Sequence, residues 1–134
     1  MPNGLTRFAG TYILACVFNT IDMDNLSQFF SKKAYEISYA ALRVSSVIKI
    51  QSFIDRFSEQ ACSLLDLAAR GKYPECKNIA ESMECLFRLG GDIGIIHPLN
   101  VQSMVQEIRQ FNSAISEYEK LVKQPIHMDL DGSF

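Results

Sequence analysis

The fold is decided by residues 74–123, PECKNIAESMECLFRLGGDIGIIHPLNVQSMVQEIRQFNSAISEYEKLVK. Apolar residues recur there at steps of three and four, the spacing that places them on one face of an α-helix. In the second half this stripe comprises Val101, Met104, Val105, Ile108, Phe111, Ile115, Tyr118 and Val122. In the first half it comprises Cys76, Ile79, Ala80, Met83, Leu86, Phe87, Gly90 and Ile93. The pattern predicts two long amphipathic helices, and because apolar stripes are unstable in water, the pair must pack against further helices.

The turn of this hairpin is expected at the segment GIIHP. Gly94 is expected to follow the C-terminus of the first helix in a left-handed conformation. His97 and Pro98 are expected to be the N-cap and the first residue of the second helix. Because the apolar stripe stays in phase through Gly90, the pair Gly90 and Gly91 is expected inside the first helix. Two interior glycines cost roughly 2 kcal/mol of helix propensity, and we expect Gly90 to let the backbone of a neighbouring helix approach.

The preceding part of the chain predicts two more helices. No Gly or Pro occurs between residues 24 and 70, and a single helix of that length would extend about 70 Å, too long for a compact domain of this size. A turn is therefore expected at residues 50–52, with Ser52 capping the next helix. Asp24 or Asn25 can cap the first of these helices, and Gly71 is expected to end the second, before Pro74 opens the third.

Both helices carry an apolar stripe. The first stripe comprises Leu26, Phe30, Ile37, Ala41, Val44 and Ile48, and the second comprises Ile54, Phe57, Ala61, Leu64, Leu65 and Ala68. Four successive amphipathic segments with short connections predict an all-α antiparallel four-helix bundle. We assign the bundle to residues 24–124, with an apolar N-terminal appendage at 1–23 and a flexible tail at 125–134.

The N-terminal appendage allows three interpretations. The uncharged run after Arg7 is about 14 residues long, shorter than the roughly 20 residues that a membrane-spanning helix needs. Ile13-Leu14-Ala15-Cys16 resembles a lipoprotein signal, in which Cys16 would carry the lipid, whereas an ordinary secretory signal lacks its A-x-A site here. In the third interpretation the natural start is Met23 and the preceding residues are a mis-called extension or a loosely docked appendage. We favour the third and leave the segment out of the core.

Composition points to one cytoplasmic domain. The chain has 134 residues and a formal net charge of −2, so it lacks the basic excess that usually accompanies binding to nucleic acid or anionic membranes. The four cysteines, Cys16, Cys62, Cys76 and Cys85, form no C-x-x-C pair, and three of them sit among apolar helical positions. This usage is typical of reduced thiols in a reducing compartment, and we expect Cys62 in the core.

Residues 80–121 resemble a known family. A short glycine-isoleucine turn, a capping residue and a helix with Met104, Ile108 and Phe111 in phase are similar to the C-terminal hairpin of a bacterial four-helix-bundle group. That group includes proteins encoded in ribosomal-RNA intervening sequences and accessory proteins of diversity-generating retroelements. The resemblance implies a ring-like oligomer and contact with nucleic acid, for which the group is often basic. The present chain departs from the group in its near-neutral charge.

No pattern predicts a catalytic, cofactor or metal site. His97 precedes Pro98 at a helix start, whereas a phosphotransfer histidine would lie inside a helix. His127, Asp129 and Asp131 resemble the start of a calcium loop but lack its closing Glu. The helical carboxylates form no E-x-x-H pair of the kind that di-iron bundles use. We therefore expect a protein that is not an enzyme and has no cofactor.

The helix around residues 29–50 carries an additional apolar stripe. Tyr35, Tyr39 and Leu42 lie to one side of the first stripe, so this helix is either central in the bundle or meets another subunit. With Phe29, these residues form the predicted interface of an oligomeric interaction or accessory protein. Self-association or a protein partner is expected, and a membrane only if Cys16 is lipidated. The alternative is a nucleic-acid-binding accessory protein, whose predicted contacts are Lys32, Lys33, Lys49 and Arg56.

Overall fold

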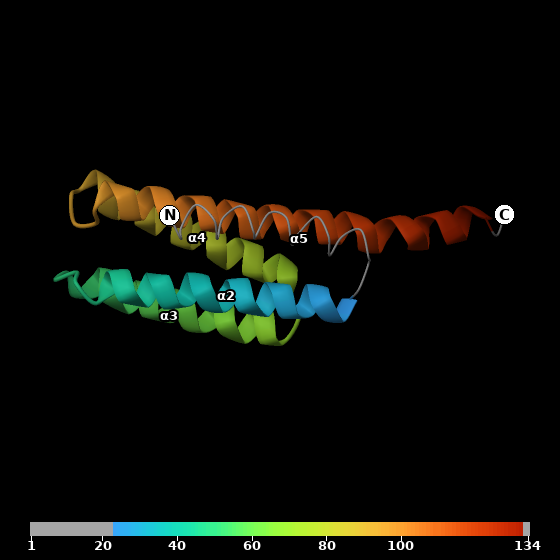
Figure 1. Ribbon diagram of the computed structural model, residues 1–134, viewed down its shortest axis with the longest axis horizontal. Coiled ribbons are helices and arrows are strands. Elements are labelled where there is room, and N and C mark those ends of the chain that lie inside the picture. The colour runs from blue at the N-terminus through green and yellow to red at the C-terminus, as the bar shows by residue number, and fades with distance from the viewer. Residues whose placement is uncertain (1–22, 133–134) are drawn as a thin grey trace.

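The computed structural model describes residues 23–132, with side chains described from residue 25 to residue 123. Four α-helices follow one another: α2 (Met23–Ser45), α3 (Gln51–Ala69), α4 (Tyr73–Asp92) and α5 (Pro98–Gly132) (Figure 1). None of the described residues lies in a β-strand. The interpretations of residues 1–22, including lipidation of Cys16, concern residues outside this description.

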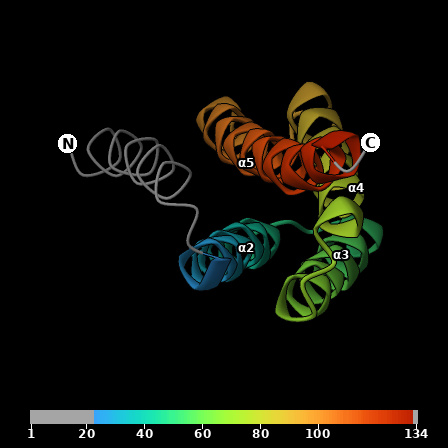
Figure 2. The same cartoon turned by 90° about the vertical axis from the view of Figure 1, so that its right-hand side faces the viewer.

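The helices form an antiparallel bundle. Each helix packs against the one before and the one after it, and α2 closes the arrangement against α5. Figure 2, which looks along the bundle, shows the four helices at the corners of a four-sided arrangement, with α2 and α5 standing farther apart than α4 and α5. The predicted all-α four-helix bundle is confirmed. Of its four seams, the one between α2 and α5 has the least extensive backbone contact.

The core is aromatic at its centre. Each helix contributes one fully buried phenylalanine: Phe30, Phe57, Phe87 and Phe111. The ring centroid of Phe30 lies 4.7 Å from that of Tyr73 and 5.6 Å from that of Tyr118. Because these three rings come from α2, α4 and α5, their packing fixes the relative height of the helices, and edge-to-face geometry adds to the burial of area.

Most residues of the predicted stripes are buried or half-buried, but Leu65, Ile93 and Val122 are exposed. Leu65 directly follows the buried Leu64, and a step of about 100° around the helix turns it away from the core. Ile93 lies just after the last residue of α4. Val122 lies one turn beyond Tyr118, which contacts the start of α4, so α5 has no neighbour there to cover it.

The turn between α2 and α3 differs from its prediction. α2 ends at Ser45 and α3 begins at Gln51, so the turn covers residues 46–50 and shares only Ile50 with the predicted residues 50–52. Ser52 is inside the first turn of α3, and no side chain caps that helix. The hydroxyls of Ser45 and Ser46 donate to the carbonyls three residues earlier, at 2.9 Å and 2.7 Å, a bond that competes with helix continuation. The start of α2 also differs, because α2 begins at Met23 and the predicted caps fall inside it.

The two glycine-containing turns follow their predictions. Gly71 and Gly94 have φ of 71° and 82°, values that a residue without a Cβ adopts at little cost. In both turns the next residue closes a Schellman motif: Lys72 N–H donates to Leu67 O at 2.9 Å, and Ile95 N–H donates to Gly90 O at 2.9 Å. These bonds satisfy carbonyls that the helix ends would leave free.

The N-terminus of α5 is capped as predicted. α5 begins at Pro98, and the Nδ1 of His97 accepts a hydrogen bond from the backbone N–H of Leu99 at 3.1 Å. At the other end α5 continues to Gly132 and so extends into the predicted tail at 125–134, whose flexibility stays a prediction. Pro125 removes one backbone donor from the helix without ending it, and the C-terminal part of α5 projects past the other three helices (Figure 1).

The glycine pair in α4 makes room for side chains of the turn and of the start of α5, and not for the backbone of a neighbouring helix. A Cβ built at Gly90 would stand 2.8 Å from Cγ1 of Ile96, whose side chain folds back from the turn and is buried. A Cβ at Gly91 would stand 2.8 Å from Cγ2 of Val101, at the start of α5. The expectation that Gly90 admits a helix backbone is therefore wrong, because side chains of the following segment occupy the space.

Candidate functional site

The outer side of α2 carries three exposed apolar side chains. Tyr35, Tyr39 and Leu42 are 60%, 52% and 40% exposed. Successive helical residues are about 100° apart, so these positions lie on the side of α2 opposite the buried stripe through Phe30 and Ile37. Because α2 packs only against α3 and α5 among the described helices, this second stripe is uncovered within the chain. α2 is therefore not a central helix.

Two of these side chains are ordered against each other. The rings of Tyr35 and Tyr39 are stacked, with centroids 6.3 Å apart and planes at 17°. The guanidinium of Arg43 lies 5.9 Å from the centroid of the Tyr39 ring and donates from Nη1 to the Tyr39 hydroxyl at 3.1 Å. We name Tyr35, Tyr39, Leu42 and Arg43 the tyrosine face. Its aromatic part is preordered, which lowers the entropy lost when a partner binds.

Phe29 does not belong to the tyrosine face. Its side chain is half-buried and packs against the core, and its ring centroid lies 5.6 Å from that of Phe30 in an edge-to-face arrangement. Phe29 was grouped with the tyrosines because it is apolar and outside the main stripe. The structure instead places it at the margin of the core, where it supports Phe30.

The four predicted nucleic-acid contacts are not brought together. Lys33 is buried, whereas Lys32, the preceding residue, is exposed on the outer side of α2. Lys49 lies in the turn after α2, whose last residue, Ser45, is about 20 Å from Lys32 along the helix axis. Arg56, on α3, is engaged with Glu59 at 3.1 Å. These residues therefore form no common basic patch.

Lys33 links α2 to α5. Its Nζ donates to Oε1 of Glu107 at 2.6 Å and lies 3.6 Å from Oε1 of Glu36. A buried ammonium requires such partners, because leaving it unpaired costs several kcal/mol. Lys33 was predicted to contact nucleic acid, although its spacing of three from Phe30 and of four from Ile37 matches the buried stripe.

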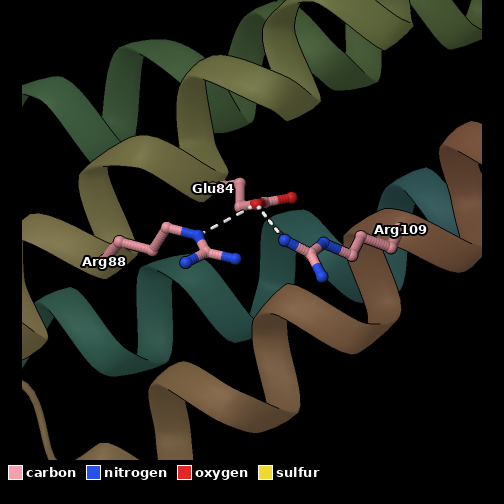
Figure 3. A network of polar contacts seen from close by, with 3 residues as sticks. All are labelled: Glu84, Arg88 and Arg109. Carbon is pink, nitrogen blue, oxygen red and sulfur yellow. Dashed lines mark hydrogen bonds and ion pairs between the residues drawn. The ribbon is translucent and has the colours of Figure 1, made fainter.

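A second polar network joins α4 to α5. Oε2 of Glu84 accepts hydrogen bonds from Arg88 Nε at 3.0 Å and from Arg109 Nη2 at 3.2 Å (Figure 3). Burial alone would raise the pKa of Glu84, but the hydrogen bonds and positive charges of Arg109 and Arg88 outweigh it and lower that pKa. The sequence does not predict this network, because no spacing along the chain indicates that Arg109 reaches Glu84 from another helix.

Two open grooves lie along the seam between α4 and α5. One encloses about 590 Å³ and the other about 570 Å³, and Arg109 lines both. Their charged walls mix both signs: Arg88 and Asp92 in the first, and Lys77, Glu81, Glu84, Glu117 and Lys120 in the second. Neither groove presents a surface of one sign, and the carboxylate of Glu84 already engages Arg88 and Arg109.

The cysteines are distributed differently from their prediction. Cys76 is buried, and its burial, followed by the charge of Glu75, raises the pKa of its thiol to about 11. Cys62, predicted in the core, is exposed, as is Cys85. Within the described residues no three His, Cys, Asp or Glu side chains cluster so as to hold a metal ion.

Over the described part of the chain, none of the helices combines the length and the apolar character that crossing a membrane requires. Comparison of the chain with protein-family models, with curated proteins and with solved structures finds no match.

Proposed function

We propose that this protein is a non-enzymatic interaction or accessory protein that works as an oligomer, with the tyrosine face of α2 as its contact surface. The observation that carries the proposal is the exposure of Tyr35, Tyr39 and Leu42 on one side of α2. Tyrosine and arginine are enriched at protein interfaces, and tyrosine supplies a large contact area at low entropic cost. These residues are clustered on one helix and held against one another.

The polar groups favour the same function. Glu84 is held by two arginines and Lys33 by Glu107, so both charged networks serve to join helices. The amide of Gln60 likewise donates to Ser82 at 2.7 Å, between α3 and α4. The described cysteines are free thiols, which suits a reducing compartment, and we place the protein in the cytoplasm.

Sedimentation velocity of the full chain at micromolar concentration tests the proposal. We expect the wild type to sediment as an oligomer, and Leu42→Glu to shift it to monomer, because a buried unpaired carboxylate opposes association. Leu89→Glu is the matched control. Leu89 is also an exposed leucine on a helix, with 49% of its surface accessible, and this variant should sediment as the wild type does.

Circular dichroism of both variants verifies that their helix content is unchanged. A wild-type protein that is monomeric throughout this concentration range would refute the proposal. So would an oligomer that Leu42→Glu leaves intact while the protein stays folded, because association would then use another surface.

A further inference from the structure

We propose that the occupant of the tyrosine face is the same face of a second copy, with the two α2 helices antiparallel and a two-fold axis passing beside Tyr39. This pairing rests on the proposed function, since it requires the outer side of α2 to be a contact surface. It adds the identity of the partner and the register in which the helices meet. Closed two-fold pairing of one surface with itself is the commonest form of homo-oligomer.

The register follows from the positions of four residues around Tyr39. At about 100° per residue, Glu36 and Arg43 lie to one side of Tyr39, and Tyr35 and Leu42 lie to the other. A two-fold axis perpendicular to both helices brings each side against the same side of the partner and reverses its order along the helix. Arg43 then comes opposite the partner's Glu36, and Leu42 comes opposite the partner's Tyr35.

Charge complementarity supports this register. Within the described residues no carboxylate forms an ion pair with Arg43, whose guanidinium contacts Tyr39 instead. The side chain of Glu36 is 42% exposed, and its Oε1 lies 3.6 Å from Lys33 Nζ, longer than the 2.6 Å that separates Lys33 from Glu107. Each copy therefore offers a cation without a carboxylate where the other offers an exposed carboxylate. Two identical ion pairs form in each dimer.

The parallel arrangement is disfavoured by the same charges. A two-fold axis parallel to the helices brings each side against the partner's other side, so Glu36 and Arg43 would face the partner's Tyr35 and the partner's Leu42, and neither ion pair would form. In the antiparallel arrangement Lys32 comes opposite the partner's Ser46, which is exposed on the same line of α2. The charges beside Tyr39 thus form ion pairs in only one direction.

Cysteine pairing tests the register. Tyr39→Cys should form a disulfide-linked dimer under mild copper-phenanthroline oxidation, because residues on the axis come within disulfide reach. Tyr35→Cys alone and Leu42→Cys alone should not, since each is displaced from its own copy by about 12 Å and about 9 Å along the helices. An equal mixture of these two variants should form the mixed disulfide. These cysteine variants are made in a chain in which three native cysteines are replaced by serine: Cys16, Cys62 and Cys85.

Charge exchange gives an independent test in which no residue becomes covalently linked. Arg43→Glu and Glu36→Arg should each raise the dimer dissociation constant about tenfold, because each creates two like-charge contacts per dimer. The double variant Arg43→Glu/Glu36→Arg should restore the wild-type dissociation constant to within about threefold. A merely structural effect of either substitution would not be reversed by the other.

The outcomes separate this pairing from the proposed function. A dimer that Leu42→Glu disrupts, but in which Tyr35→Cys links to itself or the charge exchange fails to restore association, refutes the antiparallel register and leaves the contact surface standing. A larger ring, in which Tyr39→Cys forms no disulfide, also refutes the two-fold pairing. A monomeric wild type refutes both.

Discussion

Gly90→Ala should destabilise the bundle, although alanine is the better helix former. Gly90 lies in the last turn of α4, and the Cβ added there would stand 2.8 Å from Cγ1 of Ile96 and closer still to its Cδ1. The optimal separation between nonbonded carbon atoms is about 3.5–4.0 Å. Ile96 is only 3% exposed, and its backbone N–H donates to Gly90 O at 3.1 Å. The side chain is therefore held in place and cannot easily withdraw.

Two opposing contributions decide whether Gly90→Ala stabilises or destabilises the fold. Replacing an interior helical glycine by alanine gains about 1 kcal/mol of helix propensity. Forcing a methyl group into a packed site costs about 1–3 kcal/mol, and the restrained Ile96 side chain places this site in the upper part of that range. We expect a net loss of about 1–2 kcal/mol in the free energy of unfolding, or a decrease of about 3–6 °C in Tm.

Urea denaturation followed by circular dichroism measures this loss, and a second substitution tests its cause. Ile96→Val removes the Cδ1 methyl that the new Cβ would meet most closely. The double variant Gly90→Ala/Ile96→Val should therefore be more stable than the sum of the two single losses predicts, with a coupling of about 1 kcal/mol. A Gly90→Ala variant about 1 kcal/mol more stable than the wild type would refute the reasoning, since propensity alone would then govern the site.

Two further predictions concern the charged networks. Because the pKa of Glu84 is lowered in the folded protein, its ionised form stabilises the fold above its unfolded pKa, and this stabilisation is lost as pH falls through the lowered folded value. The difference in unfolding free energy between the wild type and Glu84→Gln should thus be constant near neutral pH and decrease in acid. A difference that is independent of pH would contradict the network. Lys33→Met should cost about 1–2 kcal/mol, because it leaves the partly exposed Glu107 carboxylate without its ammonium partner. Adding Glu107→Gln should recover part of that loss in a double-mutant cycle, and strictly additive losses would show that the two side chains do not interact.

The helices were predictable because their signals are local. The repeat of apolar residues, the glycines that follow α3 and α4, and the His97–Pro98 pair each act within a few residues of chain, so their effects can be inferred without knowing what packs nearby. The turn after α2 was placed too late because no Gly or Pro marks it. The hydroxyls of Ser45 and Ser46 bond to carbonyls of the last turn of that helix, through hydrogen bonds that the sequence permits but does not require.

The second apolar stripe of α2 was visible in the sequence, but its exposure was not. Tyr35, Tyr39 and Leu42 would have the same spacing on a helix surrounded by others, and only the four-sided arrangement, in which α2 has two neighbours, leaves them uncovered. Phe29 has a similar character and lies at the margin of the core. Apolar character indicates that burial of a side chain is favourable, but it does not indicate whether the same chain provides that burial.

Periodicity and turn chemistry were thus enough to establish four helices, their order and most of the buried residues. The rotation of each helix about its axis and its height against its neighbours come from packing between segments distant in sequence. Those two quantities decide that Lys33 meets Glu107, that Arg109 reaches Glu84, and that Gly91 receives Val101. Contacts of this kind depend on how whole surfaces interlock, and so no local pattern along the chain specifies them.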